Sequence, residues 1–147
     1  MDSQLIRLGE RYPDIEESIP AVGAAYDVLK ETFRGGGKLL ICGNGGSAAD
    51  SDHIVGELMK SFELKRPIDE ALRKRLSQSD PERGAYLSDH LQAALPAISL
   101  SSHAALSTAI SNDVAGDMVF AQQVLGYGKV EDTLIGISTS GNSANIL

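Results

Sequence analysis

Two glycine- and serine-rich segments carry the groups best suited to hold a small anion. The first is Gly43-Asn44-Gly45-Gly46-Ser47, and the second spans residues 138–143 with the sequence STSGNS. Glycines lack a Cβ, so their backbone N–H groups can approach a ligand closely. The second segment adds hydroxyl donors at four positions, Ser138, Thr139, Ser140 and Ser143. Each segment alone is also typical of a helix cap and a solvated turn, but two of them together favour a phosphate site.

The first segment does not match the common nucleotide-binding loops. It has neither G-x-G-x-x-G spacing nor a lysine that could reach a triphosphate. Nucleotide binding is therefore disfavoured, and a phosphate bound here would be held largely by neutral donors.

His53 and Glu57 are four residues apart, so they share one face if the segment is helical. A carboxylate can take a proton from a carbon beside a carbonyl when its pKa suits the task. Histidine nitrogen and carboxylate oxygen are also ligands that zinc accepts. Such a pair is more often a plain surface contact, but its place just after the first loop favours a functional role.

Short apolar runs alternate with helical stretches along the chain. Strands are predicted at residues 38–42, 95–100 and 133–137, and helices at 48–61, from a cap at Ser101 or Ser102 to Ile110, and at 116–126. This alternation predicts an α/β fold with a parallel sheet. Both glycine- and serine-rich loops then follow strands, at the sheet edge where ligands bind, and each is expected to open a helix.

The N-terminal region predicts a helix over residues 14–33. Its apolar residues recur at intervals of four and three: Ile15, Ile19, Val22, Tyr26, Leu29 and Phe33. Pro20 should kink this helix or mark its start, and Gly35-Gly36-Gly37 should end it. The apolar seam fits packing on the sheet or packing between subunits. Residues 62–92 are charged and contain two prolines, which predicts a helical insertion over the surface.

Composition narrows the functional classes. The chain has 147 residues and a formal net charge of −7, with 13 basic residues and no basic tract. Nucleic acid binding needs a basic face and is disfavoured. The single cysteine, Cys42, ends a predicted strand and is expected in the core. The polar N-terminus and the lack of a long apolar run predict a cytoplasmic protein without membrane contact.

The two loops together resemble a known family. Residues 42–50 followed by His53, together with residues 136–143, resemble the phosphosugar loops of the SIS (sugar isomerase) family, and within it the phosphoheptose isomerases. The resemblance runs from the N-terminal helix to Leu147, apart from 62–92. It implies a three-layer αβα sandwich with a parallel, flavodoxin- or Rossmann-like sheet. It also implies a homotetramer that converts sedoheptulose 7-phosphate to D-glycero-D-manno-heptose 7-phosphate through an enediol, in heptose supply for lipopolysaccharide.

The same resemblance suggests residue roles. His53 and Glu57 match zinc ligands, and Glu57 also matches a catalytic residue, although a zinc-bound carboxylate is a poorer base. Asn112-Asp113 matches a substrate-contacting pair, although both residues also favour plain turns. The implied substrate-binding set is Asn44, Gly45, Gly46, Ser47, Glu57, Asn112, Asp113, Ser138, Thr139, Ser140 and Ser143. His90 and His103 are expected in solvated or capping roles.

One SIS domain is expected over residues 1–147, with an N-terminal helix at 1–34, a core at 37–61 and 94–147, and the insertion at 62–92. The family pattern continues past Leu147 by roughly 40–50 residues, about two βα units, which carry a Gln and a second His that complete the zinc site. We therefore expect this chain alone to be inactive or very weak. The alternatives are a non-catalytic SIS module that binds phosphosugars or proteins, and an isomerase for another sugar phosphate. The His53–Glu57 pair favours the enzyme.

Overall fold

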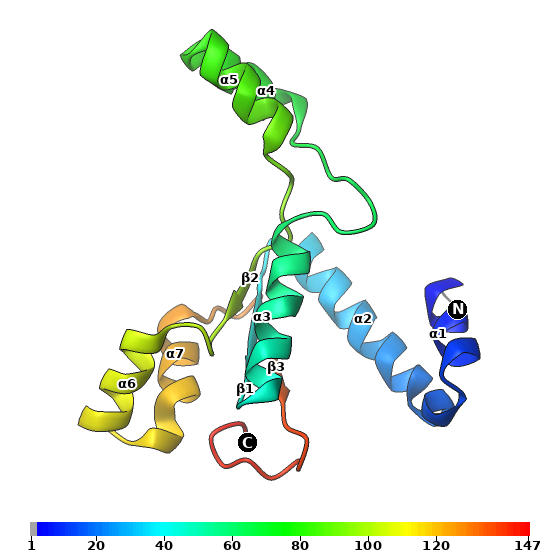
Figure 1. The fold of residues 1–147 in the computed structure, drawn as a ribbon, viewed down its shortest axis with the longest axis vertical. Helices are drawn as coiled ribbons and strands as arrows, with labels where there is room; N and C mark the ends of the chain where they lie inside the picture. The colour runs from blue at the N-terminus through cyan, green and yellow to red at the C-terminus, as the bar shows by residue number, and fades with distance from the viewer. Residues whose placement is uncertain (1–2) are drawn as a thin grey trace.

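The computed structural model describes residues 3–147 and has an α/β fold built on a three-stranded parallel sheet (Figure 1). The strands β1 (Leu39–Gly43), β2 (Ala97–Ser99) and β3 (Thr133–Ile137) lie in the order β2-β1-β3. All three predicted strands are confirmed. β2 is shorter than expected because Pro96 precedes it and contributes only its carbonyl, which accepts from the N–H of Leu39.

Helices surround this sheet and extend from it. The α-helices are α1 (Ser3–Arg11), α2 (Ile19–Arg34), α3 (Gly46–Met59), α4 (Glu70–Ser79), α5 (Pro81–His90), α6 (Ala104–Asp113) and α7 (Val119–Tyr127). Two 3₁₀ turns, η1 (Pro13–Ser18) and η2 (Gly116–Met118), precede α2 and α7. The chain thus keeps the predicted alternation of strand and helix.

The central strand supplies both faces of the core. Successive strand side chains point to opposite faces, so Leu39 and Ile41 pack with residues of α2 and α3, while Leu40 and Cys42 pack with residues of α6 and α7. This gives the predicted three layers. Cys42 is 2% exposed, which confirms its place in the core, and burial raises the pKa of its thiol.

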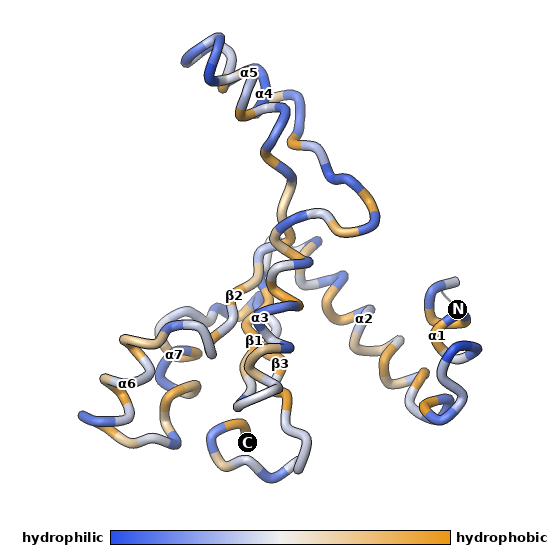
Figure 2. Tube along the Cα trace, viewed as in Figure 1, coloured by the Kyte–Doolittle hydropathy of each residue, from blue (hydrophilic) through white to orange (hydrophobic). Residues whose placement is uncertain are grey.

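The N-terminal seam divides between two environments. Residues 13–18 form η1, and α2 begins at Ile19 with Pro20 in its first turn, so proline marks the start and does not kink a longer helix. Leu29 and Phe33 pack on the sheet. Val22 and Tyr26 are 39% and 47% exposed, where α1 and the first half of α2 extend away from the sheet (Figure 1). Hydrophobic residues recur along this extension (Figure 2).

The predicted insertion contains a helical hairpin that projects from the body of the protein (Figure 1). Aspartate side chains cap both of its helices: Asp69 accepts from the N–H of Leu72, and Asp80 accepts from the N–H of Arg83. α4 and α5 touch at Gly84, where a Cβ would lie 2.3 Å from the carbonyl oxygen of Leu76. The helical character expected for this segment is confirmed.

An ion pair joins the starts of β1 and β3. The Asp132 carboxylate accepts hydrogen bonds from the ammonium and the N–H of Lys38, and from the N–H of Lys129. These interactions, above all the hydrogen bond from the Lys38 side chain, lower the pKa of Asp132 below its ordinary value. The ionised carboxylate is therefore the form that the folded state favours.

We predict that Asp132→Asn lowers the free energy of unfolding at neutral pH. In this variant the free energy of unfolding should also fall less than in the wild type as the pH is lowered. Because the folded pKa of Asp132 is lowered, its contribution is complete above the unfolded value of about 3.9 and is lost as the pH falls through the folded value. Urea unfolding at pH 7 and near pH 3 measures this. Asp27→Asn, at an exposed position on α2, is the control and should keep the wild-type profile. A wild-type acid dependence in Asp132→Asn would contradict the prediction.

Candidate functional site

The first loop turns directly from strand into helix. β1 ends at Gly43, where a Cβ would lie 2.5 Å from the carbonyl oxygen of Ser47, so the first turn of α3 can fold back only on glycine. Gly45 has φ +57°, in the left-handed region that favours glycine. The N–H of Ser47 donates to the carbonyl of Asn44, and that of Ala48 to Gly45.

This turn leaves donors unused at the start of α3. Within residues 3–147, the N–H groups of Gly45 and Gly46 have no hydrogen-bond acceptor. A helix N-terminus also carries the positive end of the helix dipole. A Cβ at Gly46 would have no other atom within 4 Å, so the space beside this residue is open. The loop therefore presents accessible backbone donors, as its sequence predicts.

Serine side chains of the second loop form hydrogen bonds with one another. Ser138 Oγ donates to Ser143 Oγ at 3.1 Å and lies 3.5 Å from Ser140 Oγ, which in turn accepts from the N–H of Asn142. Gly141 turns the chain with φ +68°. Residues 144–147 form a hydrogen-bonded turn and not the expected helix, with the N–H groups of Ile146 and Leu147 both donating to the Ser143 carbonyl.

The sheet brings both loops to one edge. β1 and β3 are neighbouring parallel strands with Gly43 paired to Ile137, so the loops leave the sheet side by side. Two reciprocal amide hydrogen bonds, 2.8 and 2.9 Å long, link Asn44 to Asn145, just beyond the second loop.

A hollow of about 340 Å³ opens beside the first loop. It is bordered by Asn44, Gly45 and Asn145, and on its other side by residues of α6 and α7. None of residues 138–143 lines it. The predicted donors thus lie at one edge of the sheet, which the Asn44–Asn145 amide pair bridges, but of the two loops only the first borders this hollow.

His53 and Glu57 lie on one face of α3, as predicted. His53 Nε2 is 3.8 Å from Glu57 Oε1, and the ammonium of Lys60 donates to the same carboxylate at 3.2 Å. The His53 side chain is 77% exposed and that of Glu57 31%. At 1.5 Å per helical residue, Glu57 lies roughly 16 Å along the axis from Gly46. Glu57 therefore lies near the end of α3 that is remote from the first loop.

The described residues do not complete a metal centre. Within residues 3–147, no group of three or more His, Cys, Asp or Glu side chains could hold a metal ion. Zinc normally takes three protein ligands and water. His53 and Glu57 are chemically suitable, but as a pair they do not fit a zinc ion on their own.

The turn predicted at Asn112-Asp113 is wrong. Both residues end α6, and the Asn112 side-chain amide donates to the Asp113 carboxylate at 2.7 Å. The helix continues through them because residues 104–110 propagate it, and the N–H of Val114 closes its last turn on Ile110. Both side chains are exposed, and neither lines the hollow.

The predicted cap of α6 is also wrong. His103 caps this helix by accepting from the N–H of Leu106 through Nδ1, which confirms the capping role expected for that histidine. Ser101 and Ser102 instead contact Gly43 and Asp52. Sequence reasoning missed these contacts, although the serine-rich run 99–102 at the end of a predicted strand resembles the two loops at the same sheet edge.

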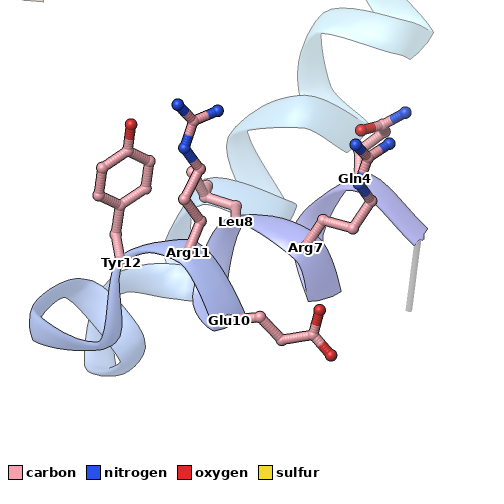
Figure 3. A pocket seen from close by; sticks show the side chains of 6 residues that line it. All are labelled: Gln4, Arg7, Leu8, Glu10, Arg11 and Tyr12. Atoms are coloured by element: carbon pink, nitrogen blue, oxygen red, sulfur yellow. The ribbon is translucent and has the colours of Figure 1, made fainter.

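A larger hollow of about 440 Å³ lies along α1, away from both loops. It is bordered by Gln4, Arg7, Leu8, Glu10, Arg11 and Tyr12 (Figure 3). These side chains come from one helix and the residue after it, and the guanidinium of Arg11 lies 5.4 Å from the Tyr12 ring centroid. It is a shallow surface of α1 and not a site shared between elements.

Comparisons with known proteins identify a family and several relatives. The family model for the SIS domain matches residues 10–90. A phosphoheptose isomerase of Roseiflexus sp. (strain RS-1) is 41% identical over 133 residues, which cover 90% of this chain and 54% of the relative. One from Shewanella sp. (strain ANA-3) is 36% identical over 135 residues, 91% of this chain and 55% of the relative. The chain thus spans about half the length of these curated relatives.

Two solved structures of phosphoheptose isomerases are also similar to this chain. The structure of phosphoheptose isomerase GmhA from Neisseria gonorrhoeae has a TM-score of 0.66 and 31% identity, covering 98% of this chain and 60% of that one. A phosphoheptose isomerase from Francisella tularensis has a TM-score of 0.65 and 27% identity, covering 99% and 66%. The α/β fold is therefore shared with these proteins.

We predict that Gly43→Ala destabilises the protein while Gly46→Ala does not. A Cβ at residue 43 meets backbone 2.5 Å away, whereas one at residue 46 meets nothing within 4 Å. Overpacking of this kind costs about 1–3 kcal/mol, and the control should stay within about 0.5 kcal/mol of wild type. Urea unfolding measures both. Equal stability of the two variants would show that α3 does not pack on the strand end as described.

Proposed function

Because the chain belongs to the SIS domain family, we propose that it carries the phosphosugar site of a ketose–aldose isomerase. The proposed reaction converts sedoheptulose 7-phosphate to D-glycero-D-manno-heptose 7-phosphate. The observation that carries this proposal is the placement of two neutral donor loops at neighbouring strand ends, with a His–Glu pair on the helix that the first loop opens. The names of the relatives support it.

The phosphate end of the substrate is assigned to the loops. A phosphate at the start of α3 would accept hydrogen bonds from the N–H groups of Gly45 and Gly46. The positive end of the helix dipole would also stabilise its negative charge. We assign further phosphate contacts to the hydroxyls of Ser47, Ser138, Thr139, Ser140 and Ser143. A bound phosphate would accept from the serines of the second loop in place of the hydrogen bonds that they now make with one another. Such hydroxyls can donate to several phosphate oxygens at once.

The carbonyl end is assigned to Glu57. Its carboxylate would take the proton from C1 of the ketose to give the enediolate. The hydroxyl proton of O1 would pass to O2, and the carboxyl would return its proton to C2, leaving the aldehyde at C1. A positioned base of this kind contributes about 10²–10⁴ in rate. The roughly 16 Å between Gly46 and Glu57 along α3 suits a long, extended substrate that reacts far from its phosphate. Asn44, Asn112 and Asp113 are kept as proposed contacts to sugar hydroxyls.

Zinc is kept as a proposed cofactor. When bound, it would polarise the carbonyl and stabilise the enediolate. His53 and Glu57 would supply two ligands, and further ligands would have to come from outside the described residues. A zinc-bound Glu57 would be a poorer base, so we assign no proton transfer through the metal.

The wider setting is also proposed. Within residues 3–147, no helix is long and apolar enough to cross a bilayer, and we propose a cytoplasmic enzyme in heptose supply for lipopolysaccharide. Exposed Val22 and Tyr26 on α2 support a homo-oligomer, proposed as a tetramer. The acidic net charge of −7 argues against a nucleic acid partner.

Two other functions use the same loops. A non-catalytic SIS module would bind phosphosugars or a protein without needing His53 and Glu57, and an isomerase for another sugar phosphate would need both. The pair lies 3.8 Å apart on one face of the helix that the first loop opens, and this placement favours an enzyme.

We predict that Ser140→Ala and Glu57→Gln separate binding from chemistry. Calorimetric titration with sedoheptulose 7-phosphate should show about tenfold weaker binding for Ser140→Ala, since a hydrogen bond to a charged group is lost. Glu57→Gln should bind within about twofold of wild type, and should lose turnover by about 10²–10⁴ wherever the wild type shows it. Thr108→Val, which removes an exposed hydroxyl on α6, is the control. A wild-type chain that does not bind the sugar phosphate would exclude the proposal.

We also predict that zinc retention depends on His53. After equilibration with zinc and dialysis, elemental analysis should find more zinc on the wild type than on His53→Ala. His90→Ala, which removes an imidazole stacked on Tyr86 of the hairpin, should retain as much as the wild type. Equal retention by all three would remove zinc from the proposal.

A further inference from the structure

Ser101 makes two hydrogen bonds to one backbone residue of the first loop. Its Oγ accepts from the N–H of Gly43 at 3.2 Å and donates to the Gly43 carbonyl at 2.9 Å. Both polar groups of Gly43 are thus satisfied by a single side chain. Gly43 is the last residue of β1 and the residue on which the first turn of α3 packs.

The Ser101 side chain occupies the position beside Gly43 where a backbone partner from β2 would otherwise lie. The parallel ladder between β1 and β2 ends with Ile41 paired to Ser99, and the N–H of Leu100 makes the last rung to the Ile41 carbonyl. β2 then turns away, so Gly43 has no backbone partner on that side. Ser101 fills this place and extends the hydrogen bonding of β1 by one residue.

The turn that carries Ser101 is held from a second direction. Ser99 Oγ donates to Asp52 Oδ1 at 2.5 Å, and Ser102 Oγ donates to the same oxygen. These hydrogen bonds, with that of Ser102 the larger effect, lower the pKa of Asp52, so the acceptor is the ionised carboxylate. Asp52 belongs to α3, the helix that the first loop opens. The serine turn is therefore fixed to both the strand before the loop and the helix after it.

We propose that Ser101 is a positioning residue for the phosphate site. It holds Gly43, and through the direct backbone packing of Gly43 on Ser47 it sets where the unused N–H groups of Gly45 and Gly46 point. Without the hydroxyl, both polar groups of Gly43 lose their partner, and the strand end can rotate to reach water. The inference rests on the proposed function, because it assigns a role within the proposed phosphate site.

The adjacent serine provides a matched control. Ser102→Ala removes a hydroxyl of the same size from the same turn, but that hydroxyl contacts Asp52 and not the loop. The bond from Ser99 to Asp52 remains in this variant. Ser101→Thr keeps the hydroxyl and serves as the conservative rescue.

The experiment measures binding and loop order in these three variants and the wild type. Calorimetry with inorganic phosphate and with sedoheptulose 7-phosphate gives the dissociation constants, and amide hydrogen exchange by NMR reports on the Gly43 N–H without any ligand. We expect Ser101→Ala to bind both probes about tenfold more weakly and to lose protection at Gly43. Ser101→Thr and Ser102→Ala should both stay within about twofold of wild type.

Urea unfolding of the same proteins separates positioning from general loss of structure. If Ser101→Ala and Ser102→Ala are destabilised alike but only the first loses binding, the positioning role holds. Wild-type binding by Ser101→Ala, or an equal loss in Ser102→Ala, would overturn it. A wild type that binds neither probe would overturn the proposed function instead, and the Gly43 amide would still decide whether Ser101 holds the loop.

Discussion

The site depends on the close contact between Gly43 and the first turn of α3. A helix can offer its N-terminal N–H groups at a sheet edge only if it begins within a few residues of the strand end. Here the carbonyl of Ser47 occupies the volume that any side chain at residue 43 would fill. Strand, loop and helix therefore form one rigid unit. The left-handed backbone of Gly45 completes the reversal in very few residues.

This rigidity matters because the proposed ligand is an anion in an acidic protein. With a net charge of −7, long-range electrostatics do not draw a phosphate toward the chain, and screening confines charge effects to about 8 Å at physiological ionic strength. Binding must then come from short, directional hydrogen bonds whose donors are already in place. Preorganised donors cost little entropy when the ligand arrives, so small displacements of the backbone have large effects on affinity.

Local pattern was enough to predict most elements, because each strand follows a loop or turn and is strongly apolar. It also placed both loops at the same edge of the sheet, because the carboxyl ends of parallel strands share an edge; the neighbouring positions of β1 and β3 came from the structure. It failed at Asn112-Asp113, where turn propensity is overridden by the helix before it. It also failed at Ser101 and Ser102, whose hydroxyls find tertiary partners 58 and 50 residues away and not a local helix end. Contacts of that range depend on how β1, β2 and α3 pack, which no local window contains.

Each end of α3 is held by contacts with residues outside the helix. The N-terminal end is fixed by Gly43, and the C-terminal end is closed by Arg66, whose Nη2 donates to the carbonyls of Leu58 and Lys60 at 2.7 and 2.8 Å. Glu57 directly precedes Leu58, and its own carbonyl accepts from the same Nη2 at 3.4 Å. The proposed phosphate donors at Gly45 and Gly46 and the Glu57 carboxylate thus lie toward opposite ends of one helix, and a ligand that reaches both must be extended.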